Sequence, residues 1–144
     1  MEKDLNSHIR EMFGMKEVDV RLYSPLSLAY IGDAVYDLII RTLVVGQGNT
    51  SPSKLHKKTS SVVKAPSQAK TLFAIEDLLT EEEEKIVKRG RNAKSYTGAK
   101  NASVTEYRLA TGFEALIGYL YLTDRFDRIV ELVRAGLEEI KDEL

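Results

Sequence analysis

Apolar residues recur every three or four positions along most of this chain, and that spacing places them on one face of an α-helix. The first such segment, residues 4–13, predicts a short helix ending at Gly14, a residue suited to the left-handed position after a helix. Val18, Val20 and Leu22 instead alternate with charged residues. This period of two predicts a short extended segment.

The most apolar stretch, residues 28–40, carries Asp33 near its middle, directly after Gly32. Ser24 can cap a helix and Pro25 suits the first helical position, so a helix is predicted to begin there. Gly and Asp are both poor helix formers, and such a local conflict is typical of a functional site or of close packing. Helical spacing predicts an apolar stripe formed by Leu28, Ile31, Val35, Leu38 and Ile39. It places Tyr30, Asp33, Asp37 and Arg41 on a second, polar face.

Capping residues and apolar spacing predict further helices after residue 50. Ser51 and Pro52 repeat the cap-then-proline start, and Ala65-Pro66 interrupts the helix that follows. A fourth helix is expected over residues 67–79. Two capping boxes, Thr80 with Glu83 and Ser103 with Glu106, predict helices that extend to Gly90 and through Tyr121 respectively. Asp124 is the expected cap of the last helix. The expected fold class is therefore all-α, a helical bundle that forms one domain over residues 1–144.

The composition allows a single core and excludes several kinds of site. With 144 residues, 43% of them hydrophobic, the chain suits one domain. It has no cysteine and only two histidines, which excludes disulfides and leaves too few ligands for a histidine-based zinc site. The first residues hold no signal-peptide core and no apolar run is long enough to cross a bilayer, so a soluble cytoplasmic protein is expected.

Asp33 and Glu114 are each the lone acid within the most apolar turns of their predicted helices. Because an unpaired buried carboxylate is costly, we expect the two to meet across a helix interface and to share a divalent cation. Mg²⁺ suits such a pair, since it binds one or two protein carboxylates and keeps several waters. A mid-helix acid is also typical of a surface salt bridge, and this interpretation stays open for each residue. Arg41 is expected to pair with Asp37, four residues away.

Basic residues are concentrated between positions 85 and 105, where the chain has no acid although its net charge is −1. Such a segment favours contact with phosphates, and lysines of the helix after Pro52 could extend the same surface. A solvated charged face is the alternative interpretation. The candidate contacts are Lys85, Lys88, Arg89, Arg91, Asn92, Lys94 and Lys100, with Lys54, Lys57 and Lys58.

Two motifs of this chain resemble the ribonuclease III family. Residues 28–35, Leu-Ala-Tyr-Ile-Gly-Asp-Ala-Val, resemble its signature helix, and residues 113–118, Phe-Glu-Ala-Leu-Ile-Gly, resemble its second catalytic motif. The resemblance extends over nearly the whole chain and is strongest to the Mini-ribonuclease III branch, which lacks a double-stranded-RNA-binding domain.

This resemblance implies an all-α endonuclease domain that works as a homodimer and cuts double-stranded RNA with Mg²⁺, for which Mn²⁺ is the expected substitute. It implies that Asp33 and Glu114 bind the metal and carry catalysis, that the basic residues bind RNA, and that Tyr30 lies at the dimer interface. The implied substrate is precursor 23S ribosomal RNA, whose 5′ and 3′ ends such enzymes mature. The chain departs from larger members at Ala29 and Thr111, where they have carboxylates, so a thinner metal-ligand shell is expected.

Two other functions stay open on the sequence alone. The two missing acids are compatible with a non-catalytic RNA-binding or ribosome-associated helical module. The second open function is that of a purely structural domain, which uses the face around Tyr30 for self-association. Tyr30 is equally typical of an ordinary core tyrosine.

Overall fold

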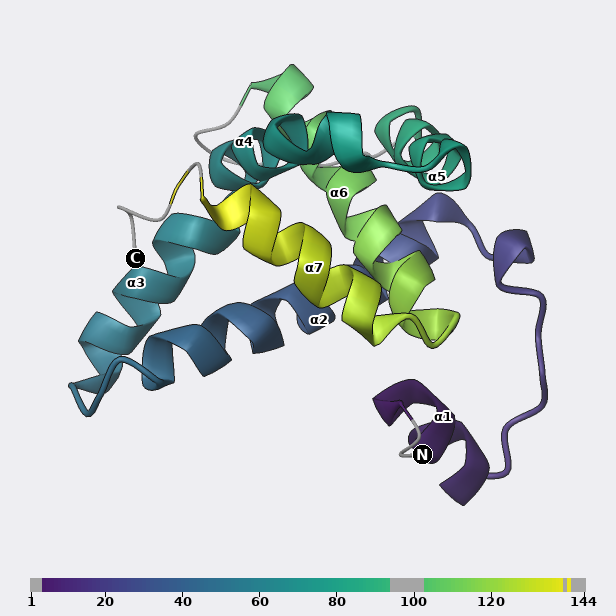
Figure 1. Cartoon of the computed structure of the whole chain (residues 1–144), viewed down its shortest axis with the longest axis horizontal. Coiled ribbons are helices and arrows are strands. Elements are labelled where there is room, and N and C mark those ends of the chain that lie inside the picture. Colours follow the sequence, from purple (N-terminus) through teal and green to yellow (C-terminus); the bar gives the residue numbers. More distant parts are fainter. Residues whose placement is uncertain (1–3, 94–102, 139, 141–144) are drawn as a thin grey trace.

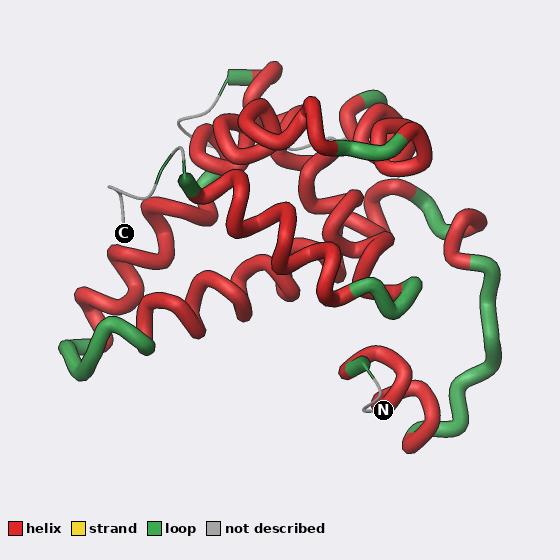
Figure 2. The backbone as a smooth tube through the Cα atoms, viewed as in Figure 1, coloured by secondary structure: helices red, strands yellow, loops and turns green. Residues whose placement is uncertain are grey.

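The computed structural model describes residues 4–93, 103–138 and 140 of the chain. In these residues the chain forms α-helices and short 3₁₀ turns without a strand, which confirms the expected all-α fold class (Figures 1 and 2). The elements are α1 (Leu5–Met12), η1 (Val20–Leu22), α2 (Pro25–Val45), α3 (Pro52–Val63), α4 (Ala65–Ile75), η2 (Glu76–Leu78), α5 (Glu81–Arg91), α6 (Val104–Leu122) and α7 (Phe126–Leu137).

Helix α6 is the central element of the fold. Its residues from Ala110 to Tyr121 are buried except Glu114, which is partly exposed. Helices α2, α4, α5 and α7 all pack against it, and the contact with α2 is the most extensive. Figure 1 shows α6 passing behind α7, with α4 and α5 on one side and α2 on the other. The rings of Tyr36 on α2 and Phe113 on α6 meet edge to face, with centroids 5.0 Å apart.

The helix starts follow the predicted caps. Ser24 and Ser51 accept hydrogen bonds from the backbone N–H groups three residues later, and a proline occupies the first turn of each helix. The capping boxes that begin α5 and α6 are both present, with Thr80 and Ser103 as the N-caps. These predictions are confirmed because capping depends on residues within one turn of each other.

One predicted element type and the bounds of two predicted helices are wrong. Val20–Leu22 is a 3₁₀ turn and not an extended segment, because the Asp19 side chain accepts from the backbone N–H of Arg21 at 3.0 Å and tightens the chain. The fourth helix begins at Ala65, earlier than expected, and ends at Ile75 with a 3₁₀ turn after it. Helix α5 continues one residue past Gly90.

Asp124 does not cap the last helix. Its φ of 59° places it in the left-handed region, and the N-cap of α7 is Arg125, whose side chain makes no capping bond. The backbone N–H of Phe126 donates instead to the Asp4 carboxylate at 3.3 Å, and Asn6 donates to Asp124 at 3.1 Å. A long-range contact therefore replaces the predicted local cap and ties α1 to the turn before α7.

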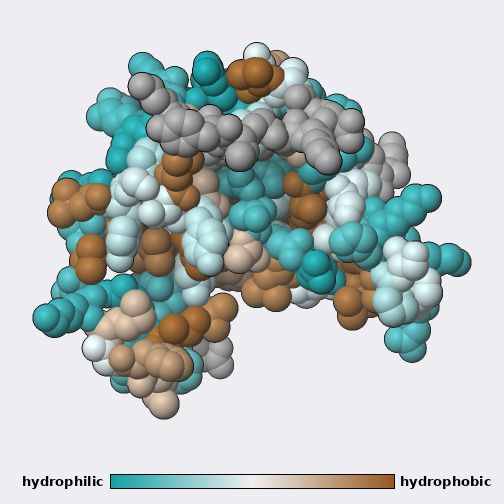
Figure 3. Space-filling model, turned by 180° about the vertical axis from the view of Figure 1, so that it is seen from behind, coloured by the Kyte–Doolittle hydropathy of each residue, from teal (hydrophilic) through white to brown (hydrophobic). Residues whose placement is uncertain are grey.

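Helix α1 lies beside the bundle and not within it. It is confirmed as a short helix followed by Gly14, whose φ of 59° is left-handed. Much of its apolar side is exposed, including Met12 and Phe13, and Figure 3 shows hydrophobic surface on this part of the molecule.

The predicted apolar stripe of α2 is only partly correct. Leu28 and Val35 are buried as expected, but the side chain of Leu38 is 51% exposed. The buried face continues instead through Tyr36 and Ile40. Because α2 is apolar on several sides, its sequence does not reveal which side contacts α6.

Candidate active site

The conflict between Gly32 and the helix around it is explained by a close approach of α2 to α6. A Cβ atom at Gly32 would lie 1.8 Å from the backbone oxygen of Glu114, and one at Gly118 would lie 1.9 Å from that of Leu28. Any larger side chain would force the two helices apart. The two glycines therefore allow the contact that brings Asp33, the residue after Gly32, to Glu114.

The side chains of Asp33 and Glu114 meet across this contact and hydrogen-bond to each other. Asp33 is exposed and Glu114 is partly exposed, so the pair is open to solvent. Burial, followed by the hydrogen bond to Asp33 and the charge of Asp33, raises the pKa of Glu114 to about 9. Near neutral pH the Glu114 carboxyl is therefore protonated and donates to the Asp33 carboxylate, and the expected convergence of the two acids is present.

Gln68 of α4 also belongs to this cluster, and it was not predicted from the sequence. Its side chain hydrogen-bonds to Glu114, which lowers the pKa of that carboxyl and opposes the larger effect of burial. Its Nε2 atom also donates to the backbone oxygen of Val63 at 2.9 Å. The sequence holds only a weak signal for this residue, a glutamine beside Ala69 on the apolar face of a helix.

The donor set of the cluster suits a hard divalent cation. Two adjacent carboxyl groups that share a proton can instead share a metal ion, which would neutralise both. In the described ranges there is no group of three or more His, Cys, Asp or Glu residues placed to hold a metal. Ala29 is buried, and the Thr111 hydroxyl donates to the backbone oxygen of Tyr107 at 3.0 Å. Within the part of the chain that the structure describes, this point therefore offers two carboxylates, and waters would fill the remaining positions on an ion.

Helix α5 presents a basic surface at its C-terminal end. Lys88, Arg89 and Arg91 are exposed in its last turns, Asn92 follows exposed, and Lys85 pairs with Glu81 at 3.8 Å. A second pair of glycines places this end of α5 against α6, because a Cβ at Gly90 would lie 2.8 Å from the Cα of Gly112. Gly112 is two residues before Glu114, so the basic end of α5 contacts the helix that carries this carboxyl group. Lys94 and Lys100 lie outside the described residues.

The lysines of α3 are not joined to this basic surface. Figure 1 shows α3 and α5 at opposite ends of the molecule. Lys54 and Lys57 are exposed, whereas Lys58 is partly buried and donates to the Gln47 side chain at 3.1 Å. A role of these lysines in RNA binding stays a prediction.

Tyr30 is not a core tyrosine. Its side chain is 83% exposed, and Leu22 and Leu26 are also exposed near this end of α2. The interpretation of Tyr30 as an ordinary core residue is therefore wrong. The ion pair predicted between Asp37 and Arg41, on the same helix as Tyr30, is confirmed, because Arg41 Nε donates to the Asp37 carboxylate at 2.7 Å.

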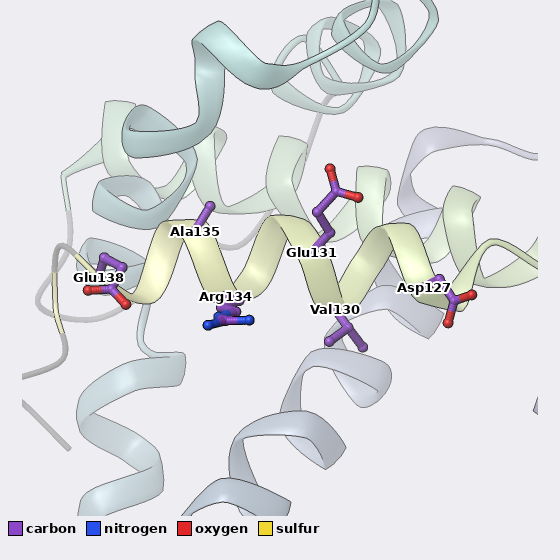
Figure 4. Close-up of a pocket in the computed structure, with 6 residues that line it drawn as sticks. All are labelled: Asp127, Val130, Glu131, Arg134, Ala135 and Glu138. Atoms are coloured by element: carbon purple, nitrogen blue, oxygen red, sulfur yellow. The ribbon is translucent and has the colours of Figure 1, made fainter.

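The surface also has a shallow groove of about 450 Å³ along α7, lined by Asp127, Val130, Glu131, Arg134, Ala135 and Glu138. Figure 4 shows Val130 and Arg134 on one side of α7 and Glu131 on the other. The groove does not include the carboxyl pair. Among the described helices, none combines the length and the hydropathy needed to cross a membrane.

A family model and similar sequences point to one family, and a solved structure has a similar fold. A model of the ribonuclease III domain matches residues 26–125, which include both acids, Gln68, Tyr30 and the basic end of α5. Mini-ribonuclease 3 of Thermoanaerobacter sp. is 46% identical over 142 residues, covering 99% of this chain and 100% of that protein. Mini-ribonuclease 3 of Clostridium tetani is 51% identical over 117 residues, covering 81% of this chain and 78% of that protein. A crystal structure of a Fusobacterium nucleatum protein superposes with a TM-score of 0.76 at 34% identity, covering 89% of this chain and 100% of that one.

Proposed function

Because the chain belongs to the ribonuclease III family and is thus an endoribonuclease, we propose that Asp33 and Glu114 form the metal-binding centre with which it cuts double-stranded RNA. The observation that carries this proposal is the contact between two acids 81 positions apart in the sequence, at a point open to solvent. Carboxyl groups in direct contact need either a shared proton or a cation between them. In the proposed nuclease centre, a cation takes the place of the shared proton.

Both acids would act as metal ligands. Asp33 and Glu114 would hold Mg²⁺, or Mn²⁺ in its place, through carboxylate oxygens. When bound, such an ion supplies activation of a water molecule and stabilisation of the oxygen that leaves the phosphodiester. Glu114 has to release its proton before both side chains can serve as ligands, and its partial exposure allows that proton to reach solvent.

The duplex would lie over the basic end of α5, which packs against the helix that carries Glu114. Lysine and arginine side chains there can contact the phosphates on both sides of the bond that is cut. Recognition would depend mostly on the shape of the duplex, because A-form RNA conceals its base edges in a deep major groove. We propose that Lys85, Lys88, Arg89, Arg91 and Asn92 provide this contact.

The assembly and the substrate also belong to this proposal. Residues 1–144 would form one endonuclease domain that pairs with a second copy through the exposed apolar surface around Tyr30, Leu22 and Leu26. The substrate would be the precursor of 23S ribosomal RNA, cut at its 5′ and 3′ ends in the cytoplasm. Support for the substrate is the similarity to Mini-ribonuclease 3 along the chain.

The Asp33→Asn variant tests the centre. It removes one charge from the pair and leaves the basic surface of α5 intact, so cleavage of duplex RNA in Mg²⁺ should be lost while binding of the duplex is retained. The matched control is Asp37→Asn, one turn further along α2, which should cut at the parental rate. Parental cleavage by Asp33→Asn would refute the assignment. Duplex binding without Mg²⁺-dependent cleavage by the unsubstituted protein would support the non-catalytic module instead.

A further inference from the structure

The side chain of Gln68 is almost fully buried, at 2% exposure, between the end of α3 and the middle of α6. Its amide contacts the backbone oxygen of Val63 on one side and the carboxyl group of Glu114 on the other. The Val63 oxygen can only accept a hydrogen bond, so the group facing it has to be the –NH₂ of Gln68. This contact determines the orientation of the amide.

The Oε1 atom of Gln68 has no hydrogen-bond partner among the described residues. A buried amide oxygen without a partner is costly, and apolar side chains of similar size pack more favourably in such a place. Thr71, one turn along α4 and equally buried, satisfies its hydroxyl within its own helix by donating to the backbone oxygen of Ser67 at 3.0 Å. Gln68 therefore differs from its neighbour in directing its polar atoms out of the helix and toward Glu114.

We propose that Gln68 is the positioning residue of the metal site: anchored by Val63, its amide holds the Glu114 carboxylate beside Asp33 and offers Oε1 to a water molecule at the site. This inference rests on the proposed function and adds to it a residue that acts through Glu114. The –NH₂ group can donate to Val63 and Glu114 at once, which leaves Oε1 to accept from a water ligand. The rigid attachment to the end of α3 makes the position of Glu114 depend on the packing of α3 and α4.

Binding of Mn²⁺ alone, measured by isothermal titration calorimetry without RNA, tests the proposal. Gln68→Met keeps the size of the side chain but removes both hydrogen bonds, and the Mn²⁺ dissociation constant should rise about 10–100-fold, as for other partners of metal ligands. Thr71→Val is the matched control on the same helix and should bind Mn²⁺ as the unsubstituted protein does. Excess Mn²⁺ should restore cleavage by Gln68→Met. Equal Mn²⁺ affinities in the two variants would overturn the role of Gln68.

A measurement on the unsubstituted protein avoids any folding defect of the variant. The chain has two glutamines, Gln68 and Gln47, and their side-chain –NH₂ resonances can be followed by NMR during a Mg²⁺ titration. The Gln68 resonance should shift with the binding isotherm, while that of the distant Gln47 should stay unchanged. A Gln68 resonance that does not respond to bound Mg²⁺ would overturn the inference. Equal Mn²⁺ affinity of Asp33→Asn and the unsubstituted protein would instead refute the proposed function itself.

Discussion

Binding of a divalent ion to the carboxyl pair should release a proton, and the structure determines how strongly pH controls this binding. The pKa of Glu114 is raised to about 9, mainly by burial and then by Asp33. At pH 7, about two units below this pKa, removing the proton from Glu114 costs about 2.7 kcal/mol. The apparent affinity for the metal ion is therefore about 100-fold weaker than it would be with Glu114 already ionised. The apparent affinity should therefore rise about tenfold per pH unit between about pH 6 and 8.

Calorimetry in buffers of different ionisation enthalpy counts the released protons. We expect about one proton per bound Mn²⁺ at pH 7, where Glu114 is almost fully protonated. Asp37→Asn should release the same number, because Asp37 pairs with Arg41 and not with Glu114. A dissociation constant that does not change between about pH 6 and 8, or binding without proton release, would refute the reasoning.

The raised pKa of Glu114 should also make the folded protein less stable as pH rises. A carboxyl whose folded-state pKa is raised contributes stability that is fully present below its unfolded value, here 4.5, and lost as pH rises through about 9. The metal-free protein should therefore become less stable across this window. Added Mg²⁺ replaces the proton, so the gain in melting temperature on adding Mg²⁺ should grow with pH. A gain that is independent of pH would contradict the assigned protonation of Glu114.

Three further predictions follow from other contacts. Gly32→Ala should destabilise the fold by at least about 1–3 kcal/mol in urea unfolding, because the added Cβ overlaps the backbone of α6. Arg128→Ala should cost about 3–5 kcal/mol in the same assay, since it removes the two hydrogen bonds, of 2.8 and 2.9 Å, that Arg128 donates to the buried carboxylate of Glu83. The pKa of Glu83 is lowered through its bonds to Arg128 against the opposing effect of burial, so this contribution is present above pH 4.5 and is lost as pH falls through the lowered value. Lys88→Gln should weaken duplex binding for all RNA sequences alike and reduce the slope of log affinity against log salt by up to about 1, whereas an unchanged slope would exclude a phosphate contact.

Long-range packing accounts for what the sequence analysis missed. Gln68 was not identified because its partners, Val63 and Glu114, lie on two other helices, one of them 46 positions away. The cap expected from Asp124 is absent because Asp4, from the other end of the chain, takes its place. The lysines of α3 and α5 share a charge pattern but lie at opposite ends of the fold. Nearby sequence gives only a weak signal for Gln68, a glutamine on an apolar helix face, and none for the other two outcomes.

The sequence by itself determined the helical class, the helix starts at Ser24, Ser51, Thr80 and Ser103, and the two acids that needed an explanation. Those features depend on residues three or four positions apart, which a helix brings together whatever the rest of the chain does. The tertiary structure decided which side of α2 is buried and how near its backbone comes to α6. That distance depends on the absence of a side chain at Gly32 and Gly118, so contact between the acids of the two helices results from how closely their backbones pack.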